Sequence, residues 1–313
     1  MKSSWKTSLL VLPLTLIVTA CGGTNEAGPS DSAATTEIRI DGSSTVAPLS
    51  AAAGELFRVD NPNVNVSVGT SGTGGGFEKF CAGETDISNA SRQIKEEEAA
   101  ICADAGIEYV EIAVANDALT VVVNKENTWA TCLTVAELSK IWSPASEGSV
   151  TNWNQVRSSF PDVALDLYGA GTDSGTFDYF TKEINGEEGA SRTDYNPTED
   201  DNVTVQGVTG SKGGLGYFGF SYYEENMDVL NAVQIDGGAG CVAPSSESAQ
   251  SGAYAPLSRP LFIYVSKTAA ARSEVKAFID FYVTNDDAIT AKALFVPLST
   301  EQKSAAAAAA ATL

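Results

Sequence analysis

Three short segments rich in glycine and hydroxyl residues are the part of this sequence best suited to chemistry. Each follows an apolar stretch and precedes a stretch of helical character. A helix N-terminus carries unpaired N–H groups and a partial positive charge, glycine allows close backbone approach, and hydroxyls add donors. Three such termini could together surround a tetrahedral oxyanion. The segments are 41–46 (Asp-Gly-Ser-Ser-Thr-Val), 69–76 (Gly-Thr-Ser-Gly-Thr-Gly-Gly-Gly) and 171–176 (Gly-Thr-Asp-Ser-Gly-Thr).

Each segment taken alone is better explained by ordinary helix capping, because serine and threonine are common N-cap residues. The glycine-rich run alone is typical of a turn. Three copies in one chain favour anion binding. None continues into the Gly-Lys-Ser/Thr of a nucleotide-binding P-loop, and none forms the Gly-x-Ser-x-Gly elbow of a hydrolase.

Arg92 is the candidate cation of such a site. It closes the segment 86–92, Asp-Ile-Ser-Asn-Ala-Ser-Arg, which follows the glycine-rich run. A guanidinium offers a rigid fork of donors that suits phosphate. A surface ion pair with one of the acids at 96–98 explains the residue equally well.

Histidine is absent from the 313 residues. This excludes a Ser-His-Asp triad, a His-ligated zinc centre and a His general base, so we expect neither an enzyme nor a metal or cofactor. The formal net charge is −21, and so acidic a chain is a poor ligand for nucleic acid. An anion would have to be held by local dipoles and hydrogen bonds.

The elements that must position these segments follow from the hydrophobic pattern. Short apolar strands alternate with helical stretches, which predicts an α/β fold with mainly parallel sheets. Thr134, followed by Glu137, predicts a capping box. We expect strands at 37–40, 64–68, 107–115, 119–124, 165–168 and 261–265, and helices at 48–59, 75–81, 134–142, 176–184 and 273–283.

Residues 1–21 have the pattern of a lipoprotein signal peptide. Lysines precede an apolar run at 9–18 that is too short for a resident membrane span, and Val-Thr-Ala-Cys resembles a lipobox ending at Cys21. Cys21 is the expected lipidation site, and the alternative is an ordinary signal with a chance cysteine. The polar residues 22–36 predict a flexible tether, and 305–313 predict an alanine-rich tail.

Four further cysteines, Cys81, Cys102, Cys132 and Cys241, predict two disulfides in an oxidising compartment. Three connectivities are possible. We favour Cys81–Cys102, which are close in sequence, together with Cys132–Cys241. Buried free thiols are the alternative.

Five motifs, in order and with consistent spacing, resemble the periplasmic phosphate-binding proteins of high-affinity phosphate ABC importers. The resemblance extends from about Ile38 to Ser299, and the motifs are specific jointly rather than singly. They are Gly-Ser-Ser-Thr-Val-Ala-Pro at 42–48, Gly-Thr-Gly-Gly-Gly-Phe at 72–77, Asp-Ile-Ser-Asn-Ala-Ser-Arg at 86–92, Leu-Tyr-Gly-Ala-Gly-Thr-Asp-Ser-Gly-Thr-Phe-Asp-Tyr-Phe at 167–180 and Pro-Leu-Ser-Arg-Pro-Leu-Phe-Ile-Tyr-Val at 256–265.

The resemblance implies a two-lobe, type II binding-protein fold with a hinge, and phosphate held between the lobes. The first lobe would comprise 37–115 and 241–304, and the second lobe 116–240. Arg259 is expected to form a structural salt bridge near the hinge. The implied phosphate ligands are Thr45, the backbone N–H of Val46, Thr73, Ser174, Gly175 and Thr176, with Ser44 and Ser71 as further neighbours.

Two positions depart from the best-known branch of that family. Ser91 stands where that branch has an aspartate that accepts the proton of monohydrogen phosphate, and Ala170 stands where it has an arginine. We expect Arg92 to supply the guanidinium from the other lobe. Ser91, Asp173 or Asp41 could accept the proton, so selectivity against sulfate stays open.

The expected function is the capture of inorganic phosphate by a monomer and its delivery to the permease and ATPase subunits of an ABC importer. The protein would be periplasmic or at the cell surface, touching the membrane only through the lipid on Cys21. Three alternatives remain: a carrier of another oxyanion such as sulfate or molybdate, an exported phosphate-ester hydrolase, and a sensory or adhesive surface protein. Anion competition, ester turnover and growth on scarce phosphate would separate them.

Overall fold

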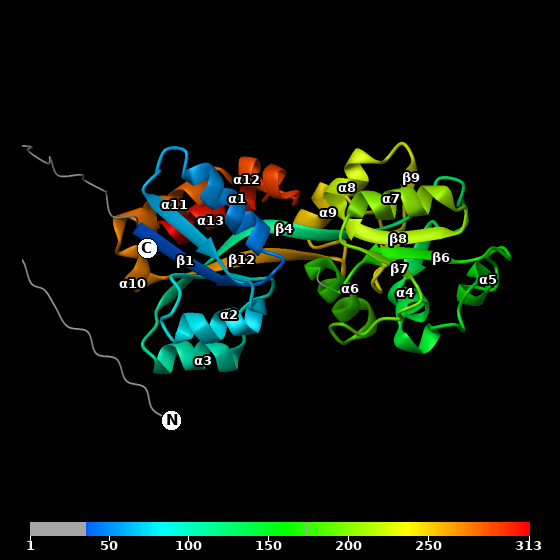
Figure 1. Ribbon diagram of the computed structural model, residues 1–313, viewed down its shortest axis with the longest axis horizontal. Coiled ribbons are helices and arrows are strands. Elements are labelled where there is room, and N and C mark those ends of the chain that lie inside the picture. Colours follow the sequence, from blue (N-terminus) through cyan, green and yellow to red (C-terminus); the bar gives the residue numbers. More distant parts are fainter. Residues whose placement is uncertain (1–35, 173) are drawn as a thin grey trace, which may run out of the picture. The chain divides into compact units, whose positions relative to one another are not determined.

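One long strand, β4 (Tyr109–Asn124), runs through both lobes of the computed structural model (Figure 1). The structure describes residues 36–172 and 174–313. The first part of β4 pairs antiparallel with β12 (Ser258–Ser266), and its second part pairs antiparallel with β8 (Gly214–Gly219) and β9 (Leu230–Ala232). The chain therefore passes to the second lobe within β4 and returns just before β12.

The first lobe packs helices against both faces of its strands (Figure 1). Ile38 and Ile40 alternate with exposed residues along the first strand and are buried with Phe278 under the helices of one face. Phe77 and Phe80 form a separate buried cluster on the other face. Besides β12, its elements are β1 (Thr36–Gly42), α1 (Ala47–Phe57), β2 (Val64–Val68), α2 (Gly72–Cys81), β3 (Ile87–Ala90), α3 (Glu96–Asp104), α10 (Lys267–Ala270), α11 (Ser273–Thr284), α12 (Asp286–Ala293) and α13 (Thr300–Ala310).

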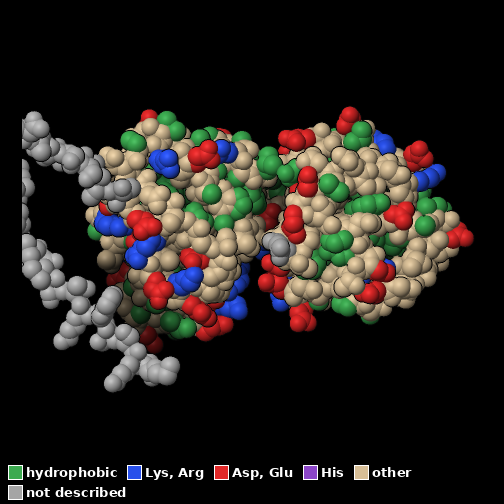
Figure 2. Space-filling view, in the orientation of Figure 1, with side chains coloured by type: hydrophobic (Ala, Val, Ile, Leu, Met, Phe, Trp, Pro, Cys, Tyr) green, Lys and Arg blue, Asp and Glu red, His purple; other side chains and the backbone are tan. Residues whose placement is uncertain are grey.

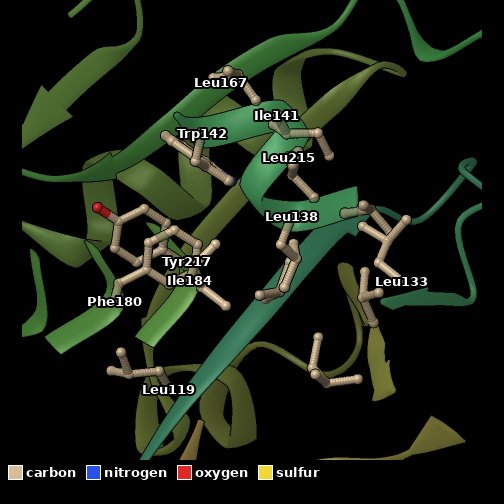
Figure 3. Close-up of a cluster of buried hydrophobic side chains, with 14 of the residues drawn as sticks. Leu119, Leu133, Leu138, Ile141, Trp142, Leu167, Phe180, Ile184, Leu215 and Tyr217 are labelled. Atoms are coloured by element: carbon tan, nitrogen blue, oxygen red, sulfur yellow. The ribbon is translucent and has the colours of Figure 1, made fainter. Parts of the chain in front are cut away.

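The second lobe is built around an aromatic core (Figure 3). The rings of Phe180 and Tyr217 stack with centroids 3.8 Å apart, and Trp142 meets Tyr217 edge-on at 5.0 Å. Besides β8 and β9, its elements are β5 (Cys132–Thr134), α4 (Val135–Trp142), a 3₁₀ turn at Pro144–Ser146, α5 (Trp153–Val156), β6 (Asp166–Ala170), α6 (Gly175–Asn185), β7 (Asn196–Thr198), α7 (Asp201–Gly210), α8 (Phe220–Glu225), β10 (Gln234–Asp236), β11 (Cys241–Val242) and α9 (Ser246–Gln250).

The strands form a mixed sheet of nine, in the order β2-β1-β3-β12-β4-β8-β6-β7 with β9 beside β4, and a small sheet β11-β10-β5. The two-lobe α/β fold is confirmed, but the expectation of mainly parallel sheets is wrong. The strand that leaves the first lobe and the strand that returns to it lie side by side, so they must be antiparallel. Their other neighbours β3, β8 and β9 also pair with them antiparallel.

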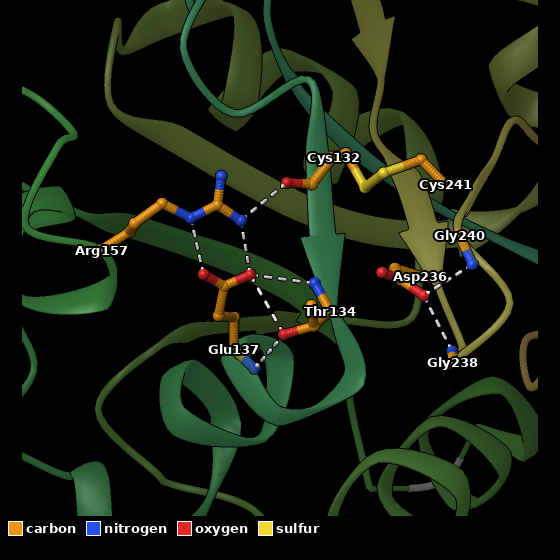
Figure 4. Close-up of a disulfide and its surroundings, with 8 residues drawn as sticks. All are labelled: Cys132, Thr134, Glu137, Arg157, Asp236, Gly238, Gly240 and Cys241. Carbon is orange, nitrogen blue, oxygen red and sulfur yellow. Dashed lines mark hydrogen bonds and ion pairs between the residues drawn. A yellow bond between two sulfur atoms is a disulfide. The ribbon is translucent and has the colours of Figure 1, made fainter.

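Both expected disulfides, Cys81–Cys102 and Cys132–Cys241, are present. The second joins β5 to β11 beside the start of α4 (Figure 4). The predicted capping box is confirmed there, because Thr134 Oγ1 accepts from the Glu137 N–H while Glu137 Oε2 accepts from the Thr134 N–H. Arg157 binds the same carboxylate through two nitrogens and so braces the strand-to-helix turn.

The two strands expected at 107–115 and 119–124 are one continuous strand. The polar residues between them resemble a loop in the sequence, but each finds a partner in the fold. Asn116 exchanges backbone hydrogen bonds with Val296, and the Asp117 carboxylate pairs with Arg259. Distant parts of the chain therefore satisfy the polar groups that appeared to interrupt the strand.

Two expected lobe boundaries need correction. Residues 241–257 belong with the second lobe rather than the first, because β11 pairs with β10, and Tyr254 and Leu257 are buried in the second lobe's core. Residues 305–310 complete helix α13 instead of forming a tail, with Ala306 and Ala310 buried in the first lobe.

The expected signal peptide at 1–21, with Cys21, lies outside the described residues, as does the expected tether except for Thr36, which begins β1. Among the helices of 36–172 and 174–313, none combines the length and apolarity that crossing a membrane requires.

Candidate functional site

A cavity of about 1010 Å³ opens where residues of both lobes face each other. The first lobe contributes the turn after β1, the start of α2 and the segment after β3, while the second lobe contributes one side of α6. Of the residues predicted from the sequence, those that line this cavity are Ser44, Thr45, Thr73, Ser91, Arg92 and Gly175.

A smaller cavity of about 250 Å³ shares three lining residues with the larger one, Ser44, Thr45 and Gly175. Ser174 and Thr176 line this second space. The predicted residues are thus distributed over two cavities that meet where the first loop contacts the start of α6.

The turn after β1 is held in place by the backbone. The Ser43 N–H donates to the carbonyl of Asn89 at 2.9 Å, and Gly42 has a φ of +137°, which favours glycine. The side chain of Val46 is buried, and its N–H donates to the carbonyl of Ser43. The Val46 N–H is therefore engaged within the turn, while Ser44 and Thr45 face the cavities.

Asp41 connects this turn to the glycine-rich segment. Its Oδ1 accepts from the Gly42 N–H and from both the N–H and the hydroxyl of Ser71, and its Oδ2 accepts from Lys79. Burial acts to raise the pKa of Asp41, but the bonds from Lys79, Ser71 and Gly42 outweigh burial and lower it to about 2. Ser71, expected as a neighbour of the ligand, is committed to Asp41 and lines neither cavity.

Thr73 and Ser91 form a hydroxyl pair on the wall of the larger cavity. Thr73 Oγ1 lies 3.1 Å from Ser91 Oγ and accepts from the Ser91 N–H at 3.2 Å. Arg92 lines the same wall, but both of its terminal nitrogens donate to Glu98, at 2.8 and 2.7 Å. The surface ion pair weighed from the sequence is therefore present, with Glu98 as the partner.

The N-terminus of α6 approaches the first loop closely. The Ser174 hydroxyl caps the helix by accepting from the Thr176 N–H at 3.2 Å. A Cβ on Gly175 would lie 2.7 Å from Thr45 Oγ1 and 3.2 Å from Ser44 Oγ. A side chain at Gly175 would therefore force the first loop and the start of α6 to move apart.

Arg259 lines the larger cavity, which the sequence analysis did not predict. The expected salt bridge near the hinge is present, with Nε donating to Asp117 Oδ2 at 3.3 Å. Arg259 Nη2 also donates to Thr45 Oγ1 at 3.3 Å. A charged residue within the apolar motif at 256–265 was the available signal.

Acidic side chains gather along the second lobe's side of the cleft (Figure 2). Asp178, Glu183 and Glu188 line the larger cavity there. Burial, and then the charge of Glu188, raise the pKa of Asp178, while Arg259 acts in the opposite direction. Burial likewise raises the pKa of Asp117, and Arg259 opposes this rise. Lys95 and Lys182 line the same cavity, so an anion there would meet cations as well as acids.

The arrangement offers donors to an anion: hydroxyls from two loops, a helix N-terminus and guanidinium groups. Among the described residues, no group of acidic or cysteine side chains has the arrangement of a metal site.

Comparison with known proteins supplies the family. Residues 27–286 match the model of the PBP superfamily domain. Protein SphX of Synechococcus elongatus is 47% identical over 98% of this chain and 89% of its own length. Phosphate-binding protein PstS of Staphylococcus saprophyticus is 41% identical over 92% of this chain and 89% of its own length.

A solved structure agrees with these relatives. The crystal structure of a possible phosphate binding protein from Planctomyces limnophilus superposes with a TM-score of 0.84 at 48% identity, covering 89% of this chain and 98% of that one. The chain therefore belongs to the PBP superfamily and is a PstS-like substrate-binding protein.

Proposed function

We propose that this protein binds inorganic phosphate between its lobes and delivers it to the permease of an ABC importer. The observation that carries the proposal is that Thr45, Thr73 and Ser91 of the first lobe and Gly175 of the second lobe line one cavity. The similarity to phosphate-binding protein PstS and to a possible phosphate binding protein of known structure supports the same ligand.

Phosphate would be held mainly by neutral donors. The start of α6 presents backbone N–H groups and a partial positive charge, and hydroxyls face it from the first lobe. Because only the closed arrangement brings both lobes to the oxygens, binding would favour closure. This gives the permease a liganded form to recognise.

Ser91 is the proposed acceptor for the proton of monohydrogen phosphate. Asp41 is unsuited to the role, because its two oxygens already accept four hydrogen bonds. Ser91 Oγ and Thr73 Oγ1 share one hydrogen bond, so lone pairs remain on the cavity wall. If the Ser91 hydroxyl gives its proton to Thr73 Oγ1, only its lone pairs face the cavity, and sulfate, which has no proton to donate, would leave them unpaired.

We further propose that the protein is exported and anchored by a lipid on Cys21, works as a monomer with the permease and ATPase subunits, and is not an enzyme. The signal-like pattern at 1–21 supports export. The similarity to phosphate-binding protein PstS supports a binding role.

Isothermal titration calorimetry tests the proposal directly. Mature, delipidated protein is titrated with phosphate and then with sulfate at two pH values. We expect tight phosphate binding and no response to sulfate. Equal binding of both anions, or binding of sulfate alone, would show that the protein carries a different oxyanion. No binding heat with either anion would overturn the proposed function.

A further inference from the structure

We propose that Arg259, rather than Arg92, is the guanidinium that serves the anion site, and that it does so by orienting the hydroxyl of Thr45. The inference rests on the proposed function, since it assumes that an anion binds beside Thr45. It assigns a positioning role to a residue whose sequence context suggests only a structural salt bridge.

The direction of one hydrogen bond carries the argument. A guanidinium can only donate, so the 3.3 Å contact between Arg259 Nη2 and Thr45 Oγ1 occupies a lone pair of the hydroxyl. The proton of Thr45 is then left to donate elsewhere. Thr45 lines both cavities, so an anion placed there meets a hydroxyl that is set to donate and polarised by a neighbouring positive charge.

Two further contacts, with Asp117 and with Tyr179, fix the position of the Arg259 side chain. It lies opposite Asp117 in the register of β12 and β4, the strands that connect the lobes, and its Nε donates to that carboxylate. Its guanidinium lies over the ring of Tyr179, 3.5 Å from the centroid. Tyr179 is itself fixed, because its hydroxyl donates to the carbonyl of Pro256 at 2.7 Å. A planar, delocalised cation suits all three contacts, whereas a lysine ammonium does not.

The same contacts join the two halves of the site. Tyr179 belongs to α6, whose N-terminus is the second lobe's share of the anion site, and Thr45 belongs to the first lobe. The guanidinium therefore lies between a ring of one lobe and a hydroxyl of the other. Its position depends on how the lobes meet.

Arg92 is less suited to the role. Both of its terminal nitrogens donate to Glu98, and Nη1 also donates to the carbonyl of Gln93. Its charge is matched by a bidentate carboxylate. Arg259 gives only Nε to Asp117 and Nη2 to Thr45, and Nη1 has no hydrogen-bond partner among residues 36–172 and 174–313.

A double-mutant cycle on phosphate affinity tests the inference. Arg259→Gln and Thr45→Val should each weaken binding at least tenfold, while the double variant should lose clearly less than the product of the two losses, since Arg259 acts through Thr45. Arg259→Lys should recover only part of the loss. Arg157→Gln, which removes another carboxylate-paired arginine that lines neither cavity, should leave affinity unchanged.

Folding is controlled separately, because Arg259→Gln leaves Asp117 buried and unpaired. Arg259→Gln combined with Asp117→Asn removes that charge and should restore the melting temperature but not the affinity. Wild-type affinity in Arg259→Gln, losses that simply multiply with Thr45→Val, or a cycle in which Arg92→Gln couples to Thr45→Val instead would each overturn the inference. Failure of the wild-type protein to bind phosphate would instead overturn the proposed function.

Discussion

Asp41 shows how one residue organises a site that it does not line. Its carboxylate ties the turn after β1 to Ser71 and Lys79, and its side chain is only 13% exposed. Because the pKa is lowered from 3.8 to about 2 in the folded protein, the ionised form stabilises the fold by about 2 kcal/mol at neutral pH. This contribution is complete above about pH 5 and is lost as the pH falls from there through about 2.

Asp41→Asn should therefore lower the free energy of unfolding by about 2 kcal/mol at pH 7, and the difference from wild type should shrink to roughly a third of that by pH 2.5. Urea unfolding at pH 7, 4 and 2.5 measures both. Asp60→Asn, at an exposed position, is the matched control and should change the free energy of unfolding by less than about 0.5 kcal/mol at pH 7. A difference for Asp41→Asn that stays constant across this range would contradict the role given to its charge.

Gly175 makes a second prediction at the residue scale. Gly175→Ala places a methyl group 2.7 Å from Thr45 Oγ1, so the first loop must move from α6 and phosphate affinity should fall at least tenfold. Stability should change by less than about 1 kcal/mol, since alanine is favoured over glycine in helices. Calorimetry and thermal unfolding separate the two effects. Gly210→Ala, where the new methyl meets no atom within 4 Å, should preserve affinity, and equal losses in both variants would contradict the argument.

At the scale of the elements, the sequence predicted those features that depend on residues close together in the chain. The alternation in β2 (Val64–Val68) and the Thr134–Glu137 capping box depend on neighbours in sequence, and both were predicted from it. The continuity of β4 and the role of Arg259 depend on partners far away: Arg259 is 142 residues from Asp117 and 214 from Thr45. The periodicity of hydrophobic residues along the chain does not reveal contacts between residues so far apart.

For the candidate site as well, the local segments could be predicted from the sequence, whereas the contacts between them could not. The three segments rich in glycine and hydroxyls identified the loops that face the cavities, because such residues mark helix N-termini wherever they fold. Which donors remain free could not be read from the residue types. Ser71 is bound to Asp41, 30 residues away, and that pairing arises only when separate elements pack together. The pairing of Arg92 with Glu98 is local, and the sequence offered it as an alternative without deciding for it.

Helix α13 illustrates how composition alone misleads, since its alanines suggested a tail. Ser299 and Gln302 form a capping box, and Ala306 and Ala310 face the first lobe's core one turn apart. Ala306→Asp buries an unpaired charge and should destabilise the protein by about 2 kcal/mol or more. Ala307→Asp changes an exposed position of the same helix and should cost well under 1 kcal/mol. Urea unfolding that gives equal losses would show that α13 is not packed as described.

At the scale of the whole molecule, the charge opposes the ligand. The chain carries a formal net charge of −21, although the larger cavity is lined by the cations Arg92, Lys95, Lys182 and Arg259 as well as by Asp178, Glu183 and Glu188. Long-range repulsion should slow the approach of phosphate, while hydroxyls, helix N–H groups and guanidinium groups act only at contact. Capture and retention are therefore controlled by different parts of the protein.

This separation predicts an unusual response to salt. Raising the ionic strength from 10 to 100 mM shortens the screening length from about 30 to about 10 Å, so the phosphate association rate constant should rise by roughly twofold or more. The dissociation rate constant should change little, because the contacts that hold phosphate are short-ranged. Stopped-flow binding measures both. Glu183→Gln with Glu188→Gln should speed association at low salt and lose that advantage at high salt, whereas Glu84→Gln with Asp60→Asn, which lie outside the cavity, should act weakly. An association rate that falls as salt is added would mean that the cations of the cleft steer phosphate inward and that the net charge does not govern its approach.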